Sequence, residues 1–128
     1  MKRLLTTLLA ASLLTLGATT ASAQTAPKSV IHVVTVVFKA GTTPEQIKAA
    51  LDGAQALPAA DKGITHVWTR AIKVQNAKGV EKPRTHVLVM EFTDEAALAA
   101  YKDSAAQKEW YKAYMPIREE STTFDITN

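Results

Sequence analysis

Residues 30–38, VIHVVTVVF, determine how the rest of this chain folds. All but His32 and Thr35 are apolar, and most are β-branched, which predicts a strand that is covered on both faces. The segments that follow must therefore cover both faces of this strand, and their sequence patterns predict which secondary structure each of them forms.

A helix is predicted directly after this strand, over residues 43–57. Thr43 caps it, Pro44 suits its first position, and Gln46 completes a capping box. Apolar residues then recur at helical spacing until Pro58, which we expect to end the helix. They are Ile47, Ala50, Leu51, Ala54 and Leu57.

The remaining elements complete a β-α-β-β-α-β order. Strands are predicted over residues 63–74 and 85–92, joined by a long polar loop, and a short last strand over residues 122–126. Between the third and last strands lies a helical region in two parts, residues 93–101 and 105–116. This order predicts a ferredoxin-like α+β fold with a four-stranded antiparallel sheet.

Helices on one face of such a sheet leave its other face bare. Alternation along the strands places an apolar set there: Val33, Thr35, Val37, Val87 and Val89. Monomers seldom expose a patch of this kind, so we expect a homodimer formed through this sheet face.

The first 23 residues have the pattern of a secretory signal peptide. Lys2 and Arg3 precede an apolar run that is too short to span a bilayer, and Ala21-Ser22-Ala23 forms a cleavage site. We therefore expect a signal peptide over 1–23, a short linker over 24–29 and one domain over 30–128. The mature protein would be periplasmic or secreted, without stable membrane anchoring.

Composition argues against several classes of protein. Removal of Lys2 and Arg3 lowers the formal net charge from +3 to +1, and no cluster of basic residues marks a nucleic-acid surface. The chain has no cysteine, so disulfides and thiolate chemistry are excluded.

Four segments in order resemble the stress-responsive dimeric α/β-barrel domain family. They are IHVVTVVFKAGTTPEQI from Ile31, ALPAADKGI from Ala56, THVLVMEFTDEAALAAY from Thr85, and the final FDI. The resemblance implies a homodimer whose two sheets close into a barrel. It also implies a small pocket between sheet and helices in each subunit.

The resemblance extends distantly to one enzyme of that family, the cofactor-free plant protein olivetolic acid cyclase. It implies that His86 stands for that enzyme's catalytic strand histidine, Tyr101 for its assisting tyrosine, and His32 for another histidine of its pocket. Gln107 stands where the enzyme has its second essential histidine.

Gln107 argues against the same chemistry here, because glutamine has no titrating proton to give or take. Ser104-x-x-Gln107 also reads as a capping box that starts the last helix. We therefore interpret His86 as a pocket group that orients a ligand, or as a buried histidine satisfied by a hydrogen bond, rather than as a catalyst.

A metal site is not predicted. His32, His66 and His86 lie on three separate predicted strands, without the short spacings typical of zinc ligands. No cofactor is predicted either.

Three functions remain open. The first is that the protein binds a small, mostly apolar molecule in a sheet–helix pocket. The second is that it is a cofactor-independent cyclase, lyase or isomerase that uses His86 and Tyr101. The third is that it is a purely structural stress protein. The predicted pocket residues are His32, Val34, His86, Leu88, Tyr101, Gln107 and Trp110.

Overall fold

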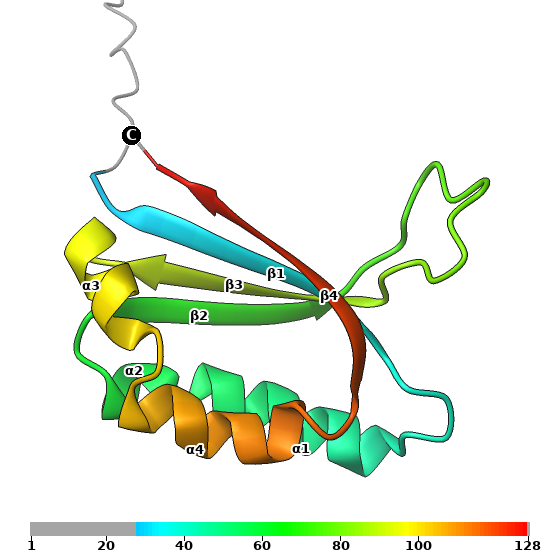
Figure 1. The fold of residues 1–128 in the computed structure, drawn as a ribbon, viewed down its shortest axis with the longest axis horizontal. Helices are drawn as coiled ribbons and strands as arrows, with labels where there is room; N and C mark the ends of the chain where they lie inside the picture. Colours follow the sequence, from blue (N-terminus) through cyan, green and yellow to red (C-terminus); the bar gives the residue numbers. More distant parts are fainter. Residues whose placement is uncertain (1–27, 128) are drawn as a thin grey trace, which may run out of the picture.

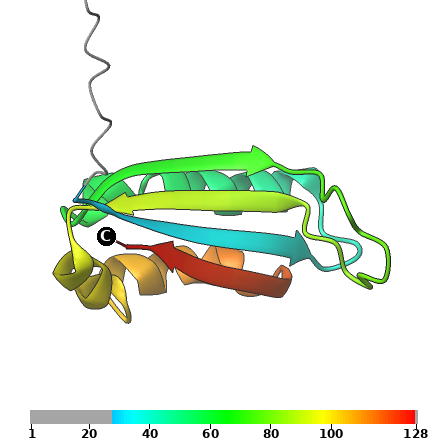
Figure 2. The same cartoon turned by 90° about the horizontal axis from the view of Figure 1, so that it is seen from above.

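A computed structural model describes residues 28–127, so the predicted signal peptide and most of the predicted linker lie outside the described residues. The domain has two layers (Figures 1 and 2). A twisted four-stranded sheet forms one layer, and helices cover one of its faces.

The sheet contains β1 (Val30–Phe38), β2 (Ile64–Ala71), β3 (His86–Phe92) and β4 (Arg118–Ile126), in the order β2-β3-β1-β4. All three pairings are antiparallel, and β1 pairs with both β3 and β4. The predicted strand order and the antiparallel sheet are confirmed.

The helices are α1 (Pro44–Gln55), α2 (Leu57–Ala60), α3 (Glu95–Tyr101) and α4 (Ala105–Tyr114). The predicted capping box is present at the start of α1, where the side chains of Thr43 and Gln46 each accept a hydrogen bond from the other residue's backbone N–H. The predicted end of this helix was wrong. α1 stops at Gln55, and Pro58 lies in the first turn of the separate helix α2, where proline is tolerated.

β4 is longer than the sequence indicated. It begins at Arg118 rather than near Thr122, because Arg118–Ser121 also pair with β1 despite their polar character. An irregularity between Val37 and Phe38 shifts the register at this end. β4 is therefore an edge strand that runs the full length of β1, with α4 beneath it (Figure 2).

The core lies between the sheet and the helices. Val36, Leu88, Met90 and Phe92 project from the sheet into it and are fully buried, together with Ala50 and Ala54 of α1. Burial of these apolar side chains provides most of the stability of a domain of this size. No helix within residues 28–127 has the length and apolar character that crossing a membrane requires.

The opposite side of the sheet, called here the helix-free face, is uncovered (Figure 2). The predicted face assignment is correct, because the register places one alternating set of β1 and β3 residues there. That set is Ile31, Val33, Thr35, Val37, Val87, Val89 and Glu91.

Two large aromatic side chains extend the helix-free face to both sides. Trp68 of β2 pairs with Val89 and is 42% exposed, and Phe124 of β4 pairs with Val33 and is 49% exposed. The sequence alone did not show on which face of the sheet Trp68 lies. An irregularity between Ile64 and His66 shifts the β2 register and sets this face.

Candidate functional site

A cavity of about 320 Å³ lies between α4 and the sheet, beneath β4. The sheet side is formed by β1, β3 and β4, and the helical side by α4 and the end of α3. Because lining residues run from Arg118 to Asp125 along β4, the cavity is elongated in the direction of that strand. We call it the α4–β4 cavity.

At one end of the cavity, His32 and Asp125 form a close pair. His32 Nδ1 lies 2.6 Å from Asp125 Oδ1, across the β1–β4 ladder that places the two residues opposite each other. Phe92 packs edge-on against the His32 ring, with 6.0 Å between ring centroids. The aspartate and the phenylalanine therefore fix the orientation of the imidazole at the cavity wall.

Two buried tyrosines contribute hydroxyl groups that make no hydrogen bond of good geometry with the described residues, although Gln107 lies near one of them and Ser121 near the other. They are Tyr101 at the end of α3 and Tyr114 at the end of α4, which are 2% and 3% exposed. Burial raises the pKa of both phenols, so both remain neutral donors at any physiological pH. A buried hydroxyl without a partner is costly, and both residues line the cavity.

Trp110 forms the rigid middle of the helical wall. Its Nε1 donates a 2.9 Å hydrogen bond to the Ala50 carbonyl oxygen, which ties α4 to α1. Its ring stacks on Tyr114, with centroids 4.6 Å apart and planes at 18°, and also contacts Tyr111. The cavity therefore has a flat aromatic side.

Gln107 forms half of the predicted capping box. Ser104 Oγ accepts a hydrogen bond from the Gln107 N–H at 3.1 Å, as expected. The Gln107 side chain instead accepts from the N–H of Asp103, at 2.8 Å, where the backbone takes a left-handed φ of 62°. Gln107 thus stabilises the α3–α4 turn while its side chain lines the cavity.

Five of the seven predicted pocket residues line the α4–β4 cavity. They are His32, Val34, Tyr101, Gln107 and Trp110. Leu88 is fully buried in the core and does not line the cavity. His86 lies elsewhere.

The structure separates His86 from His32 and Tyr101, contrary to the expectation that they come together. His32 pairs with Met90 and His86 with Val36, so the histidines are four residues apart along the ladder. At about 3.4 Å per residue, this separation is about 14 Å. The periodicity predicted the correct face but not the position along it.

His86 instead borders a shallow groove of about 380 Å³ beside α1, together with Gln55 and Thr69. Its Nδ1 lies 2.9 Å from Thr85 Oγ1, and its ring packs on Phe38 with centroids 5.2 Å apart. Burial lowers its pKa, which favours the neutral ring. These contacts match a partly buried histidine satisfied by its neighbours.

The predicted list missed the β4 side of the cavity. Arg118, Ser121, Thr123 and Asp125 all line it. The signal was present in the sequence, because Thr123 and Asp125 alternate with the apolar Phe124 and Ile126 and so belong to the opposite face.

Within residues 28–127, no three acidic or histidine side chains lie close enough together to hold a metal ion. His66 lies on the helix-free face, where its Nδ1 is 2.8 Å from Glu91 Oε2.

Several solved structures share this architecture. A Dabb family protein of ferredoxin-like fold from Mesorhizobium loti has a TM-score of 0.62 at 21% identity, over 78% of this chain and 96% of its own. A dimeric ferredoxin-like protein of unknown function from Thermobifida fusca has a TM-score of 0.63 at 16% identity, over 84% and 97%. The hydroxynitrile lyase of Passiflora edulis has a TM-score of 0.67 at 17% identity, over 79% and 94%.

These similarities show that the fold is ferredoxin-like. The model of the stress responsive A/B barrel domain family (Dabb) matches residues 30–128. The chain belongs to this family. None of the curated proteins is similar enough in sequence to match the chain.

Proposed function

We propose that this protein binds a small, mostly apolar molecule in the α4–β4 cavity. The observation that carries the proposal is the pair of buried hydroxyls, on Tyr101 and Tyr114, that line the cavity and make no hydrogen bond of good geometry with the described residues. A ligand with acceptor oxygens would satisfy both.

The form of the cavity supports this function. Small-molecule sites are concave, of about 300–1,000 Å³, with apolar and aromatic walls and a few polar groups. Val34, Met90 and Trp110 provide the apolar wall, and the His32–Asp125 pair provides a fixed polar end. The same open volume argues against a purely structural role, in which the domain's own side chains would fill the space.

Protein purified from its own host should carry the ligand. We expect native mass spectrometry to show a homodimer with a retained small molecule. The double substitution of Tyr101 and Tyr114 by Phe should reduce the retained fraction by about tenfold or more, because each lost hydrogen bond contributes about 1 kcal/mol.

The control for this experiment is Thr65→Val, which removes an exposed hydroxyl of β2 that does not line the cavity. This variant should retain the ligand. Recovery of an empty protein that also binds no apolar probe in solution would refute the proposal.

A cofactor-independent enzyme is the second candidate, with a different pair of residues from the one that the sequence suggested. His86 and Tyr101 border different cavities, whereas His32 is held by Asp125 beside the same cavity as Tyr101. A histidine oriented by a carboxylate is a common general base. The hydroxynitrile lyase of similar fold supports a test of lyase chemistry, with His32→Ala as the inactive variant.

Self-association completes the proposed assembly. The helix-free face exposes Trp68 and Phe124 around a valine-rich centre, and solved structures of similar fold are described as dimeric. Two such sheets packed face to face would close the barrel and cover both apolar faces.

Export is the last part of the proposal, and it rests on the pattern of the first 23 residues. We expect intact-mass measurement of periplasmic material to give a chain that begins at Gln24. Material that still carries Met1 after export would contradict cleavage after Ala23.

A further inference from the structure

Arg118 provides a cation at the end of the α4–β4 cavity that is remote from His32 and Asp125. It is half-buried at the start of β4 and lines the cavity with Tyr111, Tyr114 and Ser121. Its Nη1 makes one long contact, 3.4 Å from Ser121 Oγ. A guanidinium has five N–H donors, so most of its hydrogen-bonding capacity remains unused by side chains.

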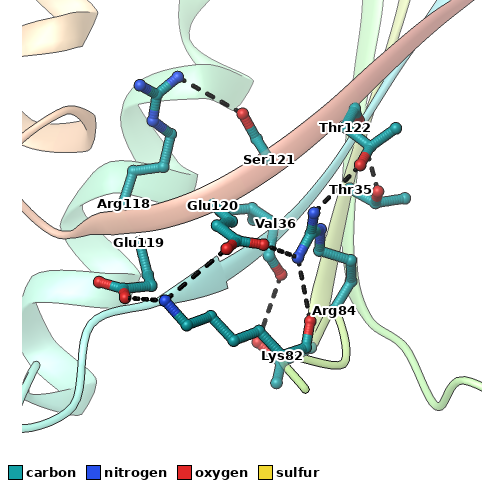
Figure 3. A network of polar contacts seen from close by, with 10 residues as sticks. Thr35, Val36, Lys82, Arg84, Arg118, Glu119, Glu120, Ser121 and Thr122 are labelled. Carbon is teal, nitrogen blue, oxygen red and sulfur yellow. Dashed lines mark hydrogen bonds and ion pairs between the residues drawn. The ribbon is translucent and has the colours of Figure 1, made fainter. Parts of the chain in front are cut away.

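The acidic residues nearest to Arg118 in sequence form ion pairs with other basic residues. Glu119 pairs with Lys82, and Glu120 Oε2 accepts a 2.9 Å hydrogen bond from Arg84 Nη1. Figure 3 shows these pairs on one side of β4, while Arg118 and Ser121 project to the other. The hydrogen bond raises the pKa of Lys82 and lowers the pKa of Glu119, so both remain charged and paired.

The charges on the cavity wall are therefore unbalanced. Asp125 is its one carboxylate, and it pairs with His32 at the far end. Arg118 forms no ion pair with any residue from 28 to 127. The nearby phenols of Tyr111 and Tyr114 stay neutral, because burial raises their pKa values more than the positive charge of Arg118 lowers them.

We propose that Arg118 binds the carboxylate of an elongated, otherwise apolar acid whose body lies along the α4–β4 cavity. The inference rests on the proposed small-molecule function and specifies the class of ligand. Arginine matches a carboxylate with two parallel hydrogen bonds, and partial burial strengthens that interaction.

The cavity wall supports this orientation. Arg118 pairs with Phe38 and Asp125 with His32, six residues apart along β1, which is about 20 Å at the rise of an antiparallel strand. Val34 of β1 and Trp110 of α4 supply apolar surface to the cavity wall. An acid bound at Arg118 would place its apolar chain along this stretch and its far end near His32.

Trp110 allows a direct test. Trp68→Phe leaves Trp110, in the cavity wall, as the chain's one tryptophan. In this parent at low ionic strength and neutral pH, titration with decanoate and with 1-decanol compares an anion with its neutral analogue. We expect both to change Trp110 fluorescence, and decanoate to bind about tenfold or more tightly.

Arg118→Met should weaken decanoate binding by about 10- to 100-fold and leave decanol unchanged, because a hydrogen-bonded ion pair is lost. Arg118→Gln is a second neutral variant in case the first does not fold. The matched control is Lys112→Met, which removes an exposed cation of α4 that does not line the cavity and should change neither affinity.

Equal binding of decanoate and decanol by the parent would overturn the role of Arg118 while supporting an apolar site. Loss of the decanoate preference in Lys102→Met but not in Arg118→Met would also overturn it, since Lys102 lines the cavity near the end of α3. If neither compound changes Trp110 fluorescence, the proposed function itself fails.

Discussion

Replacing Val89 by Lys is expected to separate the proposed homodimer into monomers. Val89 lies at the centre of the helix-free face, paired with Val33 of β1 on one side and Trp68 of β2 on the other. Face-to-face packing of two sheets would bury the new ammonium groups, and desolvation costs several kcal/mol for each. The dimer dissociation constant should rise by at least on the order of 10³-fold.

Sedimentation velocity measures this change directly. Val80→Lys is the matched control, because it makes the same substitution at a side chain that is 46% exposed in the β2–β3 loop. That variant should remain dimeric, and circular dichroism should show both proteins folded. If Val89→Lys sediments as a stable dimer, the interface lies elsewhere.

Trp110→Ala should lower the free energy of unfolding by about 3–5 kcal/mol, which is typical of removing a large buried aromatic side chain. The indole is 7% exposed, and its Nε1 ties α4 to the Ala50 carbonyl of α1. Its edge also approaches Gly53 so closely that a Cβ there would lie 3.2 Å from Cδ1. The truncation therefore opens a hole between the two helices and removes a hydrogen bond that joins them.

Urea unfolding at one fixed protein concentration measures the loss, since the stability of a dimer depends on concentration. Met115→Ala, at the C-cap of the same helix, is the control, because this side chain is 37% exposed and its loss should cost less than about 1 kcal/mol. A similar small cost for Trp110→Ala would mean that Trp110 does not hold α4 in place.

Much of the fold could be predicted because local patterns and tertiary packing agree in this chain. The β-branched run of β1 needed cover on both faces, and Thr43 and Gln46 specified the start of α1. The start of β4 was missed, because Glu119 and Glu120 do not resemble a strand. They lie in one because Lys82 and Arg84, from the preceding loop, pair with them.

The site could be predicted only in part, because periodicity specifies a face but not a position along it. His32 and Tyr101 come together at the cavity, whereas His86 shares their side of the sheet and lies elsewhere along β3. Where a side chain lies along its strand relative to the neighbouring strand depends on which residues of the two strands pair. That register is set by turns and irregularities, such as the one between Ile64 and His66, which a single sequence does not reveal.

The pairing of β1 with β4 has a consequence for the order of folding. It joins the first and last strands of the domain, so that His32 and Asp125, 93 residues apart, become neighbours. Closing so long a loop costs entropy that local contacts cannot offset, so we expect β4 to dock after β1, β2 and β3 have assembled. Because β4 forms one wall of the cavity, the cavity is complete only once the final segment of the chain has joined the sheet. A nascent chain would therefore present an open sheet edge and an incomplete cavity.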